Sequence, residues 1–338
     1  MRRTLFRNEE FGNRPSAKEK DTIQITLIHN PTSGDGSQPS GELIVKMIES
    51  AGHKVNYQST KESDWKKALK KSCDIIAVAG GDGTVGKVAR RLVGNTTPVA
   101  ILPIGTANNI GHALGLTGKL LESLITEWET ARRSNFDIGE VEGPWGSQYF
   151  VEGVGVGLFA ATILNIEKQN DPVLAAAACR QDEIARVLEI FKEQLRKHRP
   201  KKMNVLLDNE DLSDDYVLIQ ALNIRYAGPN LDLAPAANTN DGLLDVVLLR
   251  RGEEDKLSRY LSHCIKGNSE KAKLTVHRGR HLQIESNGCP IHIDDKAWSI
   301  KNDKHARPKA ISIKVAPQSI SFICPQRTRR RSRLQRAG

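Results

Sequence analysis

The chain has 338 residues, of which 38% are hydrophobic and 27% charged, which is typical of a soluble globular protein with room for two domains. We find no apolar run of about 18 residues and no signal-peptide core near the N-terminus, which argues against a membrane-spanning or secreted chain. The five cysteines form no CxxC pair and the nine histidines form no close ligand pair. These counts disfavour a disulfide framework or a zinc site and favour a cytoplasmic location.

The positive charge is concentrated at the C-terminus. The net charge is +10, and the segment "RTRRRSRLQR" supplies six arginines and no acid, which leaves +4 for the rest of the chain. We therefore expect a basic tail over 325–338. Such a tail could contact an anionic membrane surface peripherally, bind nucleic acid, or act only as a solubilising end.

Residues 1–21 are predicted to be a disordered extension, and residues 22–135 alternate strand-like and helical patterns. Strands are expected at 22–29, 53–60, 74–81 and 98–105, and helices at 40–52, 63–71 and 84–94. Alternation of this kind predicts an α/β domain with a parallel sheet covered by helices on both faces.

From residue 136 to residue 324, strand-like runs dominate. Two helical segments interrupt them, at about 173–198 and 253–266, and Pro172 and Pro200 are placed to bound the first. Many strands with few helices predict a mainly antiparallel β-sandwich as a second domain. The last strand could pack back on the first domain.

Three glycine-containing loops each follow a predicted strand of the first domain: "NPTSG" at 30–34, "GGDGT" at 80–84 and "PIGTANN" at 103–109. The carboxyl ends of parallel strands open onto one sheet edge, where ligands bind. Glycine lets the backbone approach phosphate oxygens, and the helix after "GGDGT" would add its positive N-terminal end. The spacing matches neither the GxGxxG fingerprint nor the P-loop, so we expect a different phosphate site.

These three segments, in this order, resemble the diacylglycerol kinase catalytic-domain superfamily, which includes the bacterial lipid kinases and sphingosine kinases. The segments "YFVEGVGVGLFA" at 149–160 and "DGLLDVVLL" at 241–249 continue the resemblance. It implies a fold like that of NAD kinase and phosphofructokinase in the first domain, with ATP bound between the domains. By this resemblance, ATP would be lined by Asn30, Thr60, Gly80, Gly81, Asp82, Gly83, Thr84, Gly105, Thr106 and Asn108.

The resemblance also implies Mg²⁺. The matching positions are Asn238, Asp241 and the Leu243 carbonyl, although Asp241 before a glycine is also a common turn residue.

The family's proposed catalytic base lies in a "DGE" motif, and the matching segment here departs from it. Asp294 matches the aspartate, Asp295 replaces the glycine, and Lys296 stands in place of the glutamate. A charged ammonium group cannot accept a proton, so Lys296 would neutralise phosphate charge or pair with an acid. Asp294 or Asp295 could replace it as the base, and since neighbouring strand residues face opposite sides, at most one of them would face the cleft. A second, milder departure is Asn109, where many members have aspartate.

The leading hypothesis is therefore a cytoplasmic ATP-dependent lipid kinase that phosphorylates a hydroxyl of a diacylglycerol-like or sphingoid lipid. The alternative is a nucleotide- or lipid-binding family member with weak or no activity, because of Lys296. A soluble-metabolite kinase such as NAD kinase shares the "GGDGT" loop and is the third hypothesis. Nucleic-acid binding rests on the tail alone and ranks last.

Overall fold

The computed structural model describes residues 22–169, 177, 179–268, 271–286, 288–298 and 310–326. The predicted N-terminal extension, the residues from 327 onward and the predicted helix start at Pro172 lie outside the described residues. Within the described part of the chain, no helix is both long enough and apolar enough to cross a membrane.

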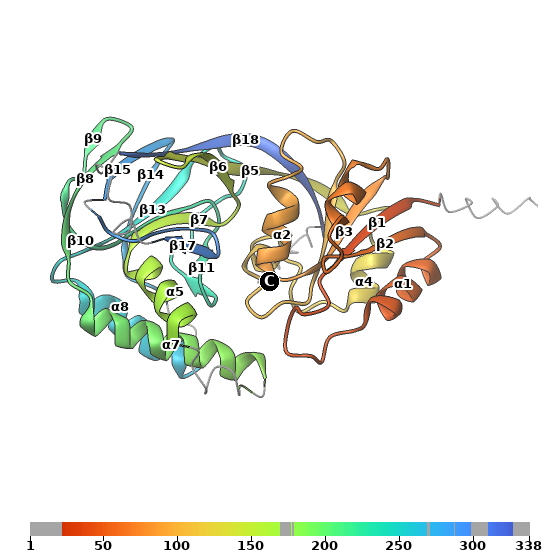
Figure 1. Cartoon of the computed structure of the whole chain (residues 1–338), viewed down its shortest axis with the longest axis horizontal. Helices are drawn as coiled ribbons and strands as arrows, with labels where there is room; N and C mark the ends of the chain where they lie inside the picture. Colours follow the sequence, from red (N-terminus) through yellow and green to blue (C-terminus); the bar gives the residue numbers. More distant parts are fainter. Residues whose placement is uncertain are drawn as a thin grey trace, which may run out of the picture.

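The first lobe is a parallel sheet with helices around it (Figure 1). Its strands run in the spatial order β2–β1–β3–β4 and have the bounds Gln24–His29 for β1, Lys54–Ser59 for β2, Ile75–Gly80 for β3 and Val99–Pro103 for β4. Its helical segments are α1 Gly41–Ser50, the 3-10 helix η1 Trp65–Lys70, α2 Asp82–Ala89, α3 Asn109–Ala113 and α4 Leu121–Thr126.

Local sequence accounts for these elements. Every residue of β3 is apolar or glycine and is buried, as expected for a central parallel strand. Strand β2 lies at the edge of the sheet, and polar residues alternate in it with Val55 and Tyr57. The helix α1 begins where the Ser40 side chain accepts a hydrogen bond from the Leu43 amide.

The second lobe is mainly antiparallel β-structure. Its strands are β5 Arg132–Gly143, β6 Gly146–Phe150, β7 Gly153–Gly157, β8 Lys201–Leu207, β9 Glu210–Asp211, β10 Asp214–Leu222, β11 Tyr226–Ala227, β12 Leu231–Asp232, β13 Leu244–Arg250, β14 Thr275–Gly279, β15 His281–Glu285, β16 Ile291–Ile293, β17 Lys296–Trp298 and β18 Ile311–Cys324. Its helices are α5 Leu158–Gln169, α7 Arg180–Lys197 and α8 Glu254–Ile265. The predicted fold class, an α/β lobe followed by an antiparallel sandwich, is confirmed.

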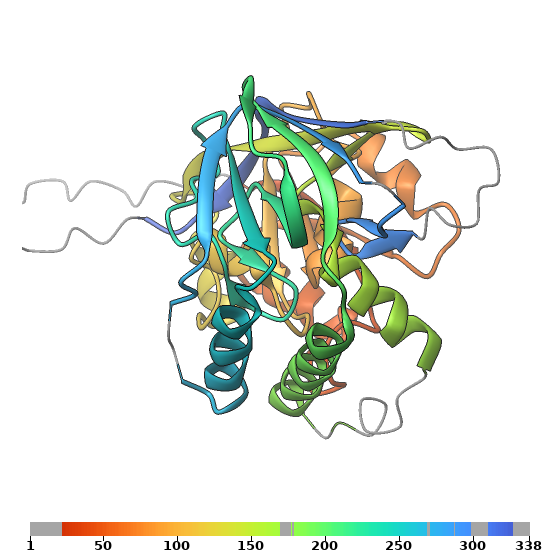
Figure 2. The same cartoon turned by 90° about the vertical axis from the view of Figure 1, so that its left-hand side faces the viewer.

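Two separate apolar layers hold this lobe together. One fills the sandwich and includes Val156, Tyr216 and Val246, while the other lies between the sheet and the helices α5, α7 and α8. Strand β13 shows the alternation directly, since Val246 faces the first layer and Val247 the second. Figure 2 shows α7 and α8 side by side beneath the strands. These helices cover one sheet face.

Two predicted elements differ from the structure. The sequence "QYFVEGVGVGLFA" at 148–160 is strand-like throughout, but it contains the end of β6, all of β7 and the start of α5. Gly157, with a φ of +94°, ends β7, and α5 begins at Leu158. The sequence has two strand-like runs, "KAISIKV" at 309–315 and "SISFIC" at 319–324, but the structure has the single strand β18, with a register shift between Ala316 and Ile320.

Strand β18 joins the two lobes along the top of the view in Figure 1. It pairs antiparallel with β15 and β5, and near its end Phe322 lies opposite Val99 in a parallel pairing with β4. The sheets of both lobes are therefore continuous through this strand.

Candidate functional site

The loops that follow β1, β3 and β4 meet at the carboxyl edge of the parallel sheet. The Asn30 side chain donates a hydrogen bond to the Thr84 hydroxyl over 3.1 Å, and the Gly81 amide lies 3.3 Å from the Ser33 hydroxyl oxygen that accepts it. The predicted convergence of these residues is therefore present, with the N-terminus of α2 at its centre.

Two of these loops touch through their glycines. A methyl group added to Gly105 would lie 2.2 Å from the Gly81 Cα, and one added to Gly81 would lie 3.0 Å from the Gly105 Cα. Only glycine permits this approach of the two backbones. The contact places two glycine backbones at the start of α2, which suits a phosphate group at a helix N-terminus.

Two polar residues predicted to line ATP also hold the loops in place. The Asp82 carboxylate accepts hydrogen bonds from the Asn109 and Ile110 amides at 2.8 and 2.9 Å, so it caps the start of α3. Asn108, in the left-handed region with a φ of +55°, accepts a hydrogen bond from the Gly105 amide and donates one to the Gly105 carbonyl. Their side chains fix the shape of the loops.

The other predicted ATP residues surround this edge. Gly80 ends β3 and Thr60 follows β2, where its amide donates to the His29 carbonyl. The Thr106 hydroxyl donates to the Glu183 carboxylate of α7 over 2.9 Å, so this loop contacts the second lobe. A cavity of about 610 Å³ lies here, and both Thr106 and Arg180 line it.

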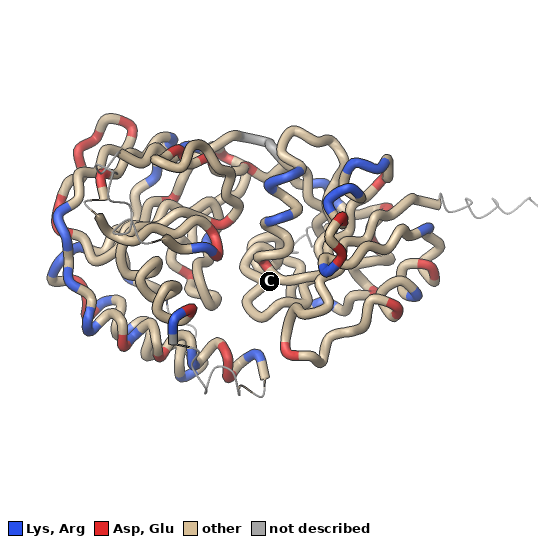
Figure 3. Tube along the Cα trace, in the orientation of Figure 1, with Lys and Arg blue, Asp and Glu red and all other residues tan. Residues whose placement is uncertain are grey.

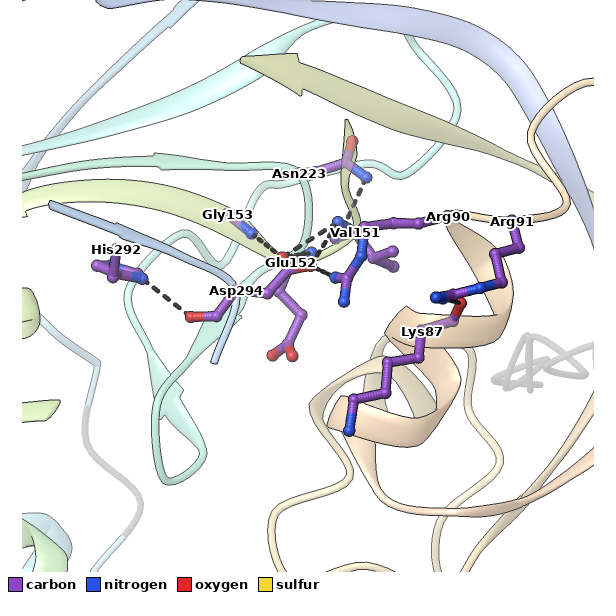
Figure 4. Close-up of polar contacts among 9 residues, drawn as sticks. All are labelled: Lys87, Arg90, Arg91, Val151, Glu152, Gly153, Asn223, His292 and Asp294. Carbon is purple, nitrogen blue, oxygen red and sulfur yellow. Dashed lines mark hydrogen bonds and ion pairs between the residues drawn. The ribbon is translucent and has the colours of Figure 1, made fainter. Parts of the chain in front are cut away.

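The β16–β17 hairpin carries the three residues predicted to be catalytic. Asp294, in the left-handed region with a φ of +49°, begins its two-residue turn. The Asp294 carboxylate is 4% exposed, forms an ion pair with Arg90 and accepts hydrogen bonds from the amides of Val151, Glu152 and Gly153 (Figure 4). This carboxylate is fully engaged, which makes it an anchor for the hairpin.

Asp295 and Lys296 lie on opposite sides of the hairpin, as expected for neighbouring residues. Asp295 approaches α2, because a methyl group on Gly83 would lie 2.9 Å from its carboxylate oxygen. Asp295 lines a cavity of about 270 Å³ together with Asp82 and Glu152, whereas Lys296 lines a different, basic cavity. Lys296 therefore does not line the cavity that contains the acidic side chains.

The 270 Å³ cavity is acidic at one end and apolar along its wall. Phe159, Ile163 and Ile166 project from one face of α5, and α7 adds Phe191. His292 stacks on Phe159, and burial lowers the pKa of His292 to about 4, so its ring is neutral at neutral pH. A small amphipathic molecule with one polar end fits this lining.

Glu152 is the acid that the sequence analysis missed. Burial, reinforced by the charges of Asp82 and Asp294, raises the pKa of Glu152 well above its usual range. The Asn109 side chain donates a hydrogen bond to the Glu152 carboxylate over 2.9 Å. Figure 4 shows this carboxylate pointing away from the contacts around Asp294. An acid inside the apolar run "YFVEGVGVG" was the signal that could have singled it out.

The predicted magnesium residues do not fit a metal ion in this arrangement. Asp241 accepts a hydrogen bond from the Leu243 amide and forms an ion pair with Arg278, and the Asn238 side chain accepts one from the Asn240 amide. A cation at Asp241 would meet the positive guanidinium of Arg278. Within the described residues, no cluster of three His, Cys, Asp or Glu side chains is arranged for a metal.

Comparisons with known proteins agree with this architecture. The description "Diacylglycerol kinase catalytic domain" matches residues 24–141, and "YegS C-terminal NAD kinase beta sandwich-like domain" matches residues 175–323. The chain is 31% identical over 282 residues to a diacylglycerol kinase of Staphylococcus carnosus, covering 79% of this chain and 87% of the relative. It is 31% identical over 232 residues to a YegS-like lipid kinase of Pseudomonas aeruginosa, covering 68% and 72%.

Solved structures show the same fold. A diacylglycerol kinase structure from Bacillus anthracis superimposes with a TM-score of 0.64 at 18% identity and covers 90% of this chain and 98% of its own. An NAD kinase from Archaeoglobus fulgidus in complex with ATP gives 0.51 at 11% identity, covering 89% and 94%.

The fold and the glycine-lined edge thus define a two-domain protein of NAD-kinase-like architecture. Its sequence places it more narrowly: the chain belongs to the diacylglycerol kinase catalytic-domain superfamily of lipid kinases.

Proposed function

We propose that this protein transfers the γ-phosphoryl group of ATP to the hydroxyl of a lipid alcohol of the diacylglycerol or sphingoid type. The observation that carries the proposal is the position of Glu152, a buried acid at the polar end of an apolar cavity and close to the N-terminus of α2. Phosphoryl transfer requires these parts to be adjacent.

The glycine loops support ATP as the donor. Gly81 and Gly105 bring two loop backbones together at the start of α2, and backbone amides at a helix N-terminus can bind phosphate oxygens. Magnesium balances phosphate charge in such reactions, and Asp295, exposed beside Gly83, is the carboxylate that could contact it. The Asn238, Asp241 and Leu243 set is not proposed for this ion.

The apolar wall supports a lipid as the acceptor. Its acyl or sphingoid chain would lie against α5 and α7 with its hydroxyl at Glu152. Glu152 takes the hydroxyl proton, the oxygen forms a bond to the γ-phosphorus, and the bond from that phosphorus to the β–γ bridging oxygen breaks, which releases ADP. A base of raised pKa suits this step because it holds the abstracted proton more tightly than an ordinary carboxylate does.

We also propose that the protein works in the cytoplasm and reaches its substrate at a membrane surface, where the tail arginines of 327–338 would attract anionic lipid. This role of the tail stays a prediction, because the tail lies outside the described residues.

The test is lipid phosphorylation from labelled ATP with the wild-type chain and with Glu152→Gln. We expect the substitution to lower kcat about 100- to 10,000-fold, as for loss of a general base, with unchanged ATP binding. Since a protonated Glu152 cannot accept a proton, wild-type kcat/KM should rise with pH through the raised pKa of Glu152, and the variant should lack this acidic limb.

Glu140→Gln is a matched control, because Glu140 lies on β5, pairs with Lys314 and does not line the cavity. Its rate should equal that of the wild type.

Full activity in Glu152→Gln would remove Glu152 from the mechanism without removing the lipid kinase activity. ATP binding without transfer to any diacylglycerol or sphingoid lipid would remove the proposed reaction and support the second candidate, a binding protein of this family. Phosphorylation of NAD in the same assay would indicate a metabolite kinase.

A further inference from the structure

A second, strongly basic pocket lies on the other side of the β16–β17 hairpin. It has a volume of about 430 Å³ and is lined by residues of both lobes. Its five cationic side chains are Lys66, Lys87, Arg90, Arg91 and Lys296. No acidic residue is among its lining residues. Figure 3 shows Lys and Arg gathered on α2 and the segment beside it.

Most of these charges are uncompensated. Arg90 is neutralised by Asp294. Within the described residues, Lys66, Lys87 and Lys296 have no ion-pair partner, and all three are exposed. Like charges gathered at one concave site repel one another unless an anion is bound there.

The dipole of helix α2 explains only part of this cluster of positive side chains. Lys87, Arg90 and Arg91 lie at the C-terminal end of α2, where positive charge favours the helix dipole (Figure 4). Lys66 belongs to η1 and Lys296 to β17, so the fold brings them to the same pocket from distant parts of the sequence. The elements η1, α2 and β17 therefore bring positive charge to one site, and the dipole of α2 accounts only for the charges on α2 itself.

Aromatic rings complete the pocket. Arg91 stacks over Trp65 at 5.4 Å, Trp298 packs on Trp145, and Tyr149 is 37% exposed at the same site. Trp and Tyr with cations are characteristic of surfaces that meet the polar layer of a membrane. The pocket is also larger than a single phosphate requires, which favours a phosphodiester headgroup or a chain of phosphates.

We propose that this basic pocket is a binding site for a phosphate-bearing anion, distinct from the acid-lined cavity. The shared chemistry is a phosphate group held by Lys66, Lys87 and Lys296. Its source is the headgroup of an anionic phospholipid or a soluble oligophosphate. Lys296 then has a role as an anion ligand at the position where the family carries an acid.

The test compares two triple variants of the full chain in binding assays that need no catalysis. The pocket variant is Lys66→Gln/Lys87→Gln/Lys296→Gln. The matched control, Lys54→Gln/Lys70→Gln/Lys201→Gln, removes three exposed lysines outside the pocket. Both variants keep the basic tail, so its contribution is the same in each. One arm uses phosphatidylglycerol–phosphatidylcholine vesicles and the other uses inorganic tripolyphosphate.

Each cation at an anionic surface contributes about fivefold to binding, so the pocket variant should bind about 100-fold more weakly and the control nearly as the wild type. A loss confined to vesicles identifies a lipid headgroup, and a loss with tripolyphosphate identifies a soluble anion. Equal losses in both variants, or no loss in either arm, would overturn the proposal. Matching thermal midpoints confirm that both variants are folded. A failure here leaves the proposed kinase reaction untouched, because that reaction is measured at Glu152.

Discussion

At the scale of single residues, Asp294 shows how the contacts of a predicted site residue can favour a structural role for it. The sequence predicts a catalytic carboxylate there, but three backbone amides and Arg90 already occupy its oxygens. Glu152 lies between Val151 and Gly153 in the segment whose amides bind Asp294, but its own carboxylate accepts a hydrogen bond from Asn109 and has a pKa raised well above its usual range. The same burial therefore produces an anchor at one acid and a candidate base at the other.

Asp294→Ala should lower the free energy of unfolding by about 3–5 kcal/mol, because it leaves Arg90 without its buried partner and three amides without an acceptor. Urea unfolding followed by circular dichroism measures this loss. Asp295→Ala is the matched control: Asp295 is the next residue and is exposed, so its substitution should change stability by less than about 0.5 kcal/mol. Equal effects of the two substitutions would contradict an anchoring role for Asp294.

At the scale of elements, most of the first lobe could be predicted and part of the second could not. Helix α2 was expected at 84–94 and is observed at Asp82–Ala89, directly after the glycine loop. The helix α5 was missed, because the turn at Gly157 that separates it from β7 has no strong local marker other than glycine itself. The loops were easier to predict since their glycines are required by contacts between backbones.

Gly105→Ala tests that requirement. The added methyl group would overlap Gly81, so we expect a loss of about 1–3 kcal/mol in unfolding free energy and weaker ATP binding by calorimetry. Gly94→Ala is the comparison, because Gly94 also has a positive φ, +76°, but faces open space after α2. It should cost stability without changing ATP affinity. An unchanged ATP affinity in Gly105→Ala would show that the contact between the loops does not shape the nucleotide site.

At the scale of the whole molecule, the two lobes share strands and a core. Strand β5 crosses the domain boundary that the sequence predicts between residues 135 and 136. The position of that boundary stays a prediction. Phe136 and Phe322 pack edge to face, with ring centroids 5.1 Å apart, inside the apolar core of the first lobe. The first lobe is therefore completed by residues from the rest of the chain.

Because of this sharing, we expect the protein to unfold in a single transition. Calorimetry should give equal calorimetric and van't Hoff enthalpies. Phe322→Ala should lower the one midpoint for the whole chain, with a loss of about 3–5 kcal/mol for a fully buried phenylalanine. Two separate transitions, with only one shifted by the substitution, would show instead that the lobes fold independently.

The sequence by itself determined the α/β lobe, the β-rich lobe and the three glycine loops, because backbone geometry and hydrophobic periodicity are local properties. It also determined the resemblance that the comparisons confirm. Only the tertiary structure decided which acids meet and which way Lys296 faces. Arg90 and Asp294 are 204 residues apart in the chain, and Glu152 reaches the same cavity from a third segment. Pairings at that separation depend on sheet register and lobe packing, and no local pattern in the sequence records them.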